Sequence, residues 1–227
     1  LLLFEKMHQI TLFEEQQTYL AIEEAETGAL RLLYQAEDWQ RAKIEKVSLI
    51  TQEDILINGE GANGMRCIYC TPEQTHYRVM LDENANAAVE NGQLAISCNL
   101  QDALGHRQTV YYAYRDATWQ IQKKTVEEIE ADRFPLMTEE QTARAFAEAV
   151  LYRHEKEMQG CLEESWDLSL EQASEFLGSF DHVYAAKTGN EGQILLQLAV
   201  KLFENAYVLH DFRCSFKQER ISNIETE

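Results

Sequence analysis

Cys67 and Cys70 form the most recognisable chemical spacing in the chain, because a Cys-x-x-Cys pair can supply two thiolates to zinc or to a redox centre. Zinc needs four ligands, and the other two can come from His76 and Cys98. The pair lies in a predicted strand, however, where side chains three positions apart point to opposite faces. A redox pair would need a helix N-terminus to lower the pKa of a thiol. We therefore expect buried structural thiols and no bound metal here.

The segment that begins at Asp82 has the alternating oxygen ligands of a calcium-binding loop, with Asn84 and Asn86 following at two-residue steps. The sixth position of such a loop requires Gly and the twelfth a bidentate Glu. This chain has Ala87 and Gln93 at those positions. The pattern therefore predicts a polar turn between strands, and no calcium ion.

The histidines are scattered along the sequence, so any metal site made of them depends on tertiary contacts. His154 lies on the apolar face of a predicted helix, and His210 and Asp211 are adjacent in the chain. If these segments pack side by side, the three side chains can bind a metal that orients water. A metal-dependent hydrolase is therefore one alternative function. The competing interpretation is a core histidine and an unrelated surface pair.

An aromatic segment is the best candidate for a ligand or partner face. Tyr112 and Tyr114 share one face of a predicted strand, Arg115 lies on the other, and Trp119 follows shortly after. Tyrosine and tryptophan combine a large apolar area with a polar group, which suits sugars, peptides or protein surfaces. The alternative is that both faces of this strand are covered by other parts of the protein.

A dense acidic run provides a second candidate partner face, made of Glu127, Glu128, Glu130 and Asp132. An acidic surface of this kind attracts a basic partner and makes association sensitive to salt. If the carboxylates lie at about the spacing of phosphates, the chain can also act as a nucleic-acid mimic that inhibits a nucleic-acid-binding protein. Mimicry is therefore a further alternative function.

The elements that carry these residues in the first half are predicted to be strands. The pattern predicts a hairpin within residues 15–46, with Gly28 at its turn, although a single long helix is the alternative. Short apolar runs then alternate with turn signals, which is typical of an antiparallel sandwich or barrel-like domain. We assign this mostly β domain to residues 1–131. Its later strands are expected at 46–50, 54–57, 65–70, 76–81, 94–98, 109–114 and 119–122.

The second half, residues 132–227, is predicted to be a small, mostly α-helical domain. Capping boxes at Thr138 and Ser169 predict two helix starts, and Gly160 and Gly178 are the expected ends. Residues 193–209 are predicted to form a third, nearly all-apolar helix. Alternation in the same segment leaves a strand as the alternative. The last residues are polar and expected to fray. The fold class predicted from the sequence is therefore α+β.

The composition limits the possible partners. The chain has 227 residues, 45% of them hydrophobic, and 20 basic against 39 acidic side chains give a net charge of −19. Direct binding to nucleic acid or to an anionic membrane is disfavoured, because both require clustered cations. Residues 61–125 are neutral, with six basic and six acidic side chains, so the acidity belongs to the flanks and chiefly to the second half.

Five cysteines, an odd number, do not suggest a disulfide framework and favour a cytoplasmic protein with reduced thiols. No stretch of the sequence is apolar enough and long enough to predict a membrane span. No catalytic constellation emerges, and no cofactor is expected. The sequence therefore favours a non-catalytic protein-interaction or assembly module whose partner is another protein with a basic surface.

Overall fold

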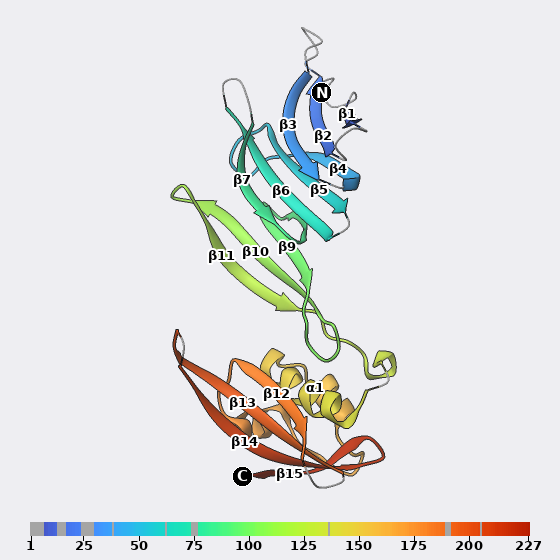
Figure 1. Cartoon of the computed structure of the whole chain (residues 1–227). Helices are drawn as coiled ribbons and strands as arrows, with labels where there is room; N and C mark the ends of the chain where they lie inside the picture. Colours follow the sequence, from blue (N-terminus) through green and yellow to red (C-terminus); the bar gives the residue numbers. More distant parts are fainter. Residues whose placement is uncertain are drawn as a thin grey trace. The chain divides into compact units, whose positions relative to one another are not determined.

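The computed structural model describes residues 7–12, 17–23, 30–37, 39–61, 63–73, 77–135, 137–188, 192–204 and 206–227, with side chains described from Trp39 onward except at Gln40 and Ala131. The chain divides into two compact units (Figure 1). Unit 1 comprises Leu1–Cys98 and Gln108–Thr125, and unit 2 comprises Asn99–Arg107 and Val126–Glu227. The loop between two strands of unit 1 therefore belongs to unit 2.

The first three strands confirm the hairpin predicted within residues 15–46. β1 (Met7–Leu12), β2 (Gln17–Glu23) and β3 (Leu30–Glu37) form an antiparallel sheet in sequence order. The long-helix alternative is wrong, because β2 and β3 pair along their lengths. The turn with Gly28 lies outside the described residues.

Two four-stranded sheets complete unit 1, and both are built from neighbouring strands. The first runs in the order β4-β5-β6-β7 and the second in the order β11-β10-β9-β8. Five of these strands contain a segment predicted as a strand, β7 covers 77–81 of the predicted segment 76–81, and β8 occupies part of the expected polar turn. The strand predicted at 46–50 is wrong, because β4 ends at Val47 and residues 49–51 form the connection held by Asp54. Their bounds are β4 (Trp39–Val47), β5 (Asp54–Gly61), β6 (Gly64–Pro72), β7 (Tyr77–Glu83), β8 (Asn86–Glu90), β9 (Gln93–Asn99), β10 (Arg107–Arg115) and β11 (Thr118–Val126).

Alternation along β5 and β6 sends apolar side chains to two core clusters on opposite faces of their sheet. One cluster holds Leu56, Cys67 and Tyr69 together with Leu94 of the second sheet. The other cluster includes Cys70. The prediction that Cys67 and Cys70 point to opposite faces and are buried is confirmed. Burial raises the pKa of both thiols to about 12, so they are neutral packing groups.

A buried carboxylate, Asp54, holds the connection between β4 and β5. Its Oδ2 accepts hydrogen bonds from the N–H groups of residues 49–51 at 2.7 to 3.1 Å, and from the hydroxyl of Tyr69. Its Oδ1 accepts from the hydroxyls of Thr51 at 2.7 Å and Thr71 at 2.9 Å. Burial alone raises the pKa of Asp54, but these hydrogen bonds outweigh it and lower the pKa overall.

The second segment of unit 2 contains first η1 (Ala131–Arg133) and then three helices, α1 (Glu139–Tyr152), α2 (Glu155–Cys161) and α3 (Leu170–Leu177). Both predicted capping boxes are confirmed, at Thr138 before α1 and Ser169 before α3. The end predicted at Gly160 is wrong. α1 stops where Arg153 adopts a left-handed conformation, and Gly160 lies inside α2. None of the described helices is both long and apolar enough to cross a membrane.

Four antiparallel strands follow, in the order β12 (His182–Lys187), β13 (Gln193–Phe203), β14 (Ala206–Lys217) and β15 (Arg220–Thr226). The helix predicted over 193–209 is therefore wrong, as are the mostly helical character of this half and its frayed end. Ile194, Leu196 and Leu198 alternate along β13 and pack with the helices into one core. Pairing with β12 and β14 satisfies the backbone of β13, so the two-residue period prevails.

Candidate functional site

One face of α1 holds the loop 99–107 in unit 2. Arg144, Glu148 and Tyr152 are spaced four residues apart, so they line a single face of the helix. Arg144 donates to the carbonyl of Gln101 at 2.6 Å, and Glu148 accepts from the N–H of Ala103 at 2.8 Å. Arg144 also pairs with Glu148 at 2.7 Å, which compensates part of the cost of burying that carboxylate.

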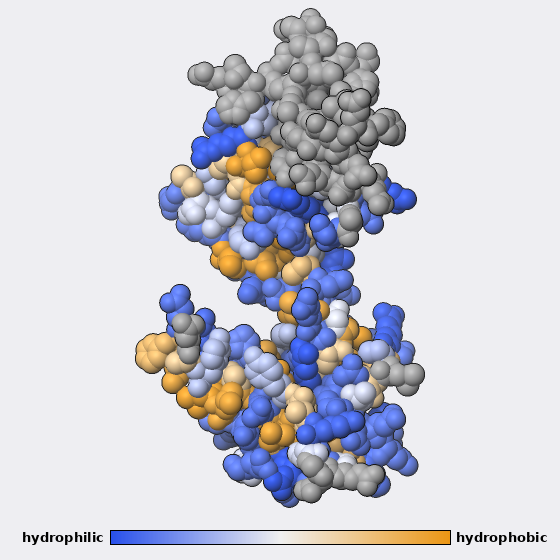
Figure 2. All heavy atoms as spheres, in the orientation of Figure 1, coloured by the Kyte–Doolittle hydropathy of each residue, from blue (hydrophilic) through white to orange (hydrophobic). Residues whose placement is uncertain are grey.

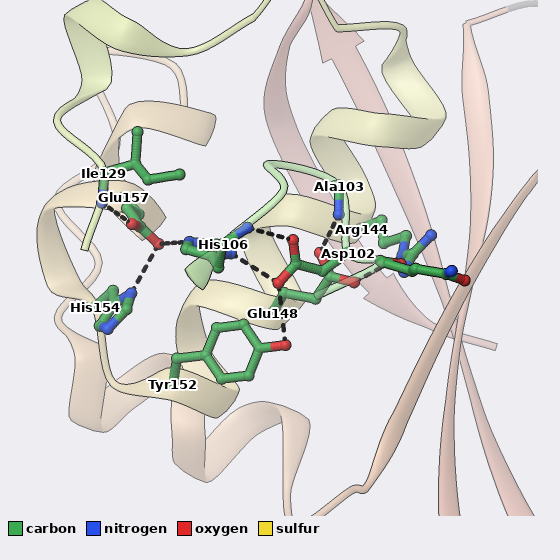
Figure 3. Close-up of polar contacts among 10 residues, drawn as sticks. Asp102, Ala103, His106, Ile129, Arg144, Glu148, Tyr152, His154 and Glu157 are labelled. Carbon is green, nitrogen blue, oxygen red and sulfur yellow. Dashed lines mark hydrogen bonds and ion pairs between the residues drawn. The ribbon is translucent and has the colours of Figure 1, made fainter. Parts of the chain in front are cut away.

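His106 is the centre of a buried polar network on this loop (Figure 3). Its Nδ1 lies 2.8 Å from Oδ2 of Asp102, and its Nε2 lies 2.9 Å from Oε2 of Glu157. The Asp102 carboxylate also accepts the backbone N–H of His106 at 2.9 Å and the hydroxyl of Tyr152 at 3.3 Å. Both imidazole nitrogens thus face carboxylate oxygens, which only accept, so His106 donates from both.

The short helix α2 supplies the other half of the network. Glu157 is completely buried, and its Oε2 accepts from Nδ1 of His154 at 2.9 Å as well as from His106. The second oxygen of Glu157, Oε1, accepts the backbone N–H of Ile129. His154 occupies the N-cap position of α2 without a side-chain capping bond, three residues before Glu157, so both side chains project from the same turn. A single carboxylate therefore joins the loop, α2 and the segment before η1.

The hydrogen bonds of His106 to Asp102 and Glu157 determine which of these three side chains are charged. Burial alone lowers the pKa of His106, but the hydrogen bonds to Asp102 and Glu157 reverse this and raise it to about 9. The same contacts lower the pKa of both carboxylates against the opposing effect of burial. At neutral pH the network consequently holds an imidazolium between two carboxylates. Glu148 differs from them, because burial dominates and raises its pKa.

This arrangement contains donor types that bind metal ions. His106, His154 and Glu157 each offer one ligand atom, and these three atoms lie within 4.8 Å of one another. Among the described residues, no other group of three His, Cys, Asp or Glu side chains meets this criterion. No buried side-chain nitrogen or oxygen in the described part lacks a hydrogen-bond partner, so the network also stabilises the fold.

The residues predicted for a hydrolase site are not brought together. His154 joins His106 and Glu157, whereas Asp211 accepts a hydrogen bond from Gln197 at 3.0 Å within the β13–β14 pair. His210 is exposed on β14. Sequence reasoning missed His106 and Glu157. The available signals were the four-residue spacing from Asp102 to His106 and the three-residue spacing from His154 to Glu157, neither of which is specific alone.

The other two segments with metal-ligand spacing, at Cys67 and at Asp82, have local roles in unit 1. Cys67 and Cys70 pack into clusters on opposite faces of their sheet, so they do not face a common ion; Cys98 is exposed, and His76 lies outside the described residues. Asp82 closes a bidentate ion pair with Arg66, at 2.5 and 2.6 Å, across β6 and β7. The carboxylate that would open a calcium loop is therefore engaged in cross-strand pairing.

The aromatic face predicted on β10 and β11 is partly used in packing. Tyr112 and Trp119 lie against the shared core of unit 1. The ring of Trp119 meets those of Tyr69 and Tyr114 edge-on, with centroids 5.2 and 5.1 Å apart, and its Nε1 donates to the carbonyl of Met80. Arg115 is exposed. The assignment of these residues to a ligand or partner face stays a prediction.

The predicted acidic partner face is accessible to solvent. Glu127, Glu128, Glu130 and Asp132 are all exposed, before and within η1. Lys156 pairs with Glu130 at 3.5 Å and compensates one of the four charges. The surface is therefore available to a basic partner, and its use stays a prediction.

An exposed apolar surface, which sequence reasoning missed, lies where β13 turns into β14. Figure 2 shows hydrophobic residues gathered at this end of unit 2. We call this surface the hairpin patch, and its most exposed member, Phe203, is 76% exposed. The signal in the sequence was the apolar run on both sides of Glu204, which an all-apolar helix explained equally well. The patch comprises Leu202, Phe203, Tyr207, Val208 and Leu209, whose side chains are distributed over both faces of the hairpin.

Comparison with known proteins adds no functional information. No family model, curated protein or solved structure matches this chain. The geometry of the two units therefore carries the functional argument.

Proposed function

We propose that this chain is a non-catalytic protein-interaction module that binds its partner through the hairpin patch of unit 2. The observation that carries the proposal is the exposure of five large apolar side chains within residues 202–209, each between 40% and 76% exposed. Single exposed apolar residues are ordinary on protein surfaces, but five of them within eight residues of one hairpin support an interaction site.

The patch suits a partner that covers it with apolar groups. Phe203 and Tyr207 offer aromatic area of the kind that dominates interface energetics. Complete burial of one such side chain is worth about 1.5–3 kcal/mol. Two or three buried anchors therefore supply enough free energy for an interface whose remaining contacts are neutral.

The charges around the hairpin patch are mostly negative, so a partner with basic residues around its contact surface would fit it best. Glu204 lies at the turn of the hairpin, and Asp181 accepts the backbone N–H of Lys201 at 2.8 Å. Asp211 lies further along β14. These three carboxylates outnumber the nearby Lys201, and the chain as a whole carries −19. A partner with lysine or arginine around an apolar centre would be steered to this surface and held more weakly at high salt.

We also infer that the two four-stranded sheets of unit 1 are the layers of the β-sandwich expected from the sequence. Supporting this, Leu56 and Tyr69 of one sheet share a core cluster with Leu94 and Ile96 of the other. The aromatic strand of this unit remains a secondary candidate face.

The test compares a double variant in the patch with a control variant at an exposed apolar residue outside it. Phe203→Ser with Leu209→Ser removes two members of the patch, and Ile121→Ser removes an exposed isoleucine of β11 that is 57% exposed. A photo-crosslinking residue at position 207 captures the partner, which is identified and then purified for binding measurements. We expect the double variant to weaken binding at least about 30-fold, since two anchors are lost, and Ile121→Ser to leave it unchanged.

Three outcomes contradict the proposal. The first is a purified partner that binds the double variant as tightly as the wild type. The second is binding that does not weaken as salt rises, which removes the basic-rim component. The third is dimerisation of the chain through the patch, measured by analytical ultracentrifugation, because the occupant is then a second copy.

A further inference from the structure

We propose that His106, His154 and Glu157 form a binding site for a single zinc ion in unit 2. The site is independent of the hairpin patch, and it draws on a loop and a helix that lie far apart in the sequence. Figure 3 shows both imidazoles directed at the Glu157 carboxylate.

The distances suit zinc after a small expansion. Oε2 of Glu157 lies 2.9 Å from Nε2 of His106 and 2.9 Å from Nδ1 of His154. Zinc bonds of about 2.0–2.2 Å place neighbouring ligand atoms about 3.3–3.6 Å apart at the tetrahedral angle. Each pair that includes Oε2 of Glu157 therefore has to separate by only about 0.4–0.7 Å to admit the ion, and the two imidazole nitrogens lie within 4.8 Å of each other. The donor set of two imidazoles and one carboxylate favours zinc over magnesium or calcium, which prefer oxygen ligands.

The three proposed ligands are held in place by hydrogen bonds from neighbouring groups, as metal ligands in proteins usually are. Nδ1 of His106 donates to Asp102, which orients the ring and leaves Nε2 free to face the ion when its proton is displaced. Asp102 is itself held by the hydroxyl of Tyr152 and by the backbone N–H of His106. Oε1 of Glu157 accepts the N–H of Ile129, so Oε2 is the oxygen directed at both histidines.

Zinc takes the place of the two protons that Oε2 of Glu157 accepts. The proton on Nε2 of His106 passes to solvent, and His154 retains one proton by carrying it on Nε2 instead of Nδ1. The side chain of His154 is 11% exposed, while those of His106 and Glu157 are fully buried, so the ion enters from the His154 side. Three protein ligands would leave a fourth coordination position for water.

The test measures zinc binding by the full chain after chelation and dialysis. We expect one Zn²⁺ per chain by elemental analysis and calorimetry. Co²⁺ bound in place of zinc should give visible absorption bands but no near-ultraviolet band from a thiolate ligand. The absence of that band would exclude Cys98 as a ligand. His154→Gln keeps a donor to Glu157 and is expected to weaken binding by at least about 100-fold. Asp102→Asn, which perturbs the orientation of His106, is expected to weaken it about 10–100-fold.

The matched control is His210→Ala, which removes an exposed histidine of the same unit and is expected to bind zinc as the wild type does. The proposal is overturned if the wild-type chain binds no stoichiometric zinc. It is also overturned if a His154→Gln variant with a native circular dichroism spectrum binds zinc unchanged. A rise in melting temperature with zinc in the wild type and not in His154→Gln separates this site from binding to the unfolded chain.

Discussion

The hydroxyl of Tyr69 provides a sharp test of how unit 1 is stabilised. Tyr69 is completely buried and donates to Oδ2 of Asp54, the carboxylate that holds residues 49–51. Tyr69→Phe removes this donor and retains the ring that packs edge-on against Trp119. The perturbation is therefore confined to one hydrogen bond. Burial and the neighbouring carboxylate raise the pKa of Tyr69, so the hydroxyl stays protonated and remains a donor.

The expected loss follows from the charge of the acceptor. A hydrogen bond to an ionised group contributes about 1.5–3 kcal/mol, against about 0.5–1.5 kcal/mol between neutral groups. Asp54 keeps its contacts to Thr51, to Thr71 and to the backbone of the loop, so it is not left unpaired. We therefore expect Tyr69→Phe to lower the free energy of unfolding of unit 1 by about 2 kcal/mol at neutral pH.

The pH dependence follows from the lowered pKa of Asp54. Because the folded state holds this pKa below the ordinary value of 3.8, ionisation of Asp54 stabilises the protein above pH 3.8. That stabilisation is lost as the pH falls below 3.8 and through the pKa of the folded state. The difference between wild type and Tyr69→Phe should therefore shrink to about 1 kcal/mol or less in acid, where the acceptor is neutral.

Urea-dependent hydrogen exchange, followed by mass spectrometry on peptides from β5 and β6, measures unit 1 separately from unit 2. A loss below about 0.5 kcal/mol at neutral pH would refute the argument, because the hydrogen bond would then contribute almost nothing. An equal loss at neutral and acidic pH would refute the role of the Asp54 charge. Thr125→Val, whose hydroxyl makes only a 3.5 Å contact to the carbonyl of Thr109, serves as a control.

Three further predictions concern packing, capping and thiol reactivity. Gly59→Ala should destabilise unit 1 and shift its tryptophan fluorescence, because an added Cβ would lie 2.3 Å from the ring of Trp39; unchanged emission and stability would contradict that packing. Thr138→Ala should cost about 1 kcal/mol by removing the cap of α1, measured by urea denaturation of unit 2, and no loss would mean the cap is dispensable. Cys98 should be alkylated first by iodoacetamide in the native protein, since the other four cysteines are buried and their thiol pKa values are raised to about 12; mass spectrometry showing early labelling of a buried cysteine would contradict this.

Local patterns predicted much of the fold correctly. The alternation in β5 and β6, the turn residues between strands and the capping boxes at Thr138 and Ser169 are each encoded within a few residues. Such signals act before any tertiary contact forms, so they are legible in one sequence. The same holds for the opposite orientations of Cys67 and Cys70, which follow from the pleat of a strand.

The wrong prediction of a helix over residues 193–209 shows that local sequence signals do not always decide between helix and strand. Gln193, Gln197 and Lys201 form a polar stripe at helical spacing, while Ile194, Leu196 and Leu198 alternate as in a strand. Both periods are present in the sequence, and only β12 and β14 on either side decide between them. The exposed hairpin patch follows from that decision, because a strand carries its apolar residues beyond the part of the sheet that the helices cover.

By itself, the sequence determined the α+β class, the predominantly antiparallel first half, the acidic second half and the burial of the Cys67–Cys70 pair. Only the tertiary structure brought His106 to His154 and Glu157, across about fifty residues of sequence, by placing the loop 99–107 against α1. The physical reason is that a buried carboxylate needs donors but does not specify where in the chain they originate. Local sequence periods specify elements, whereas the pairing of buried charges is chosen when those elements pack.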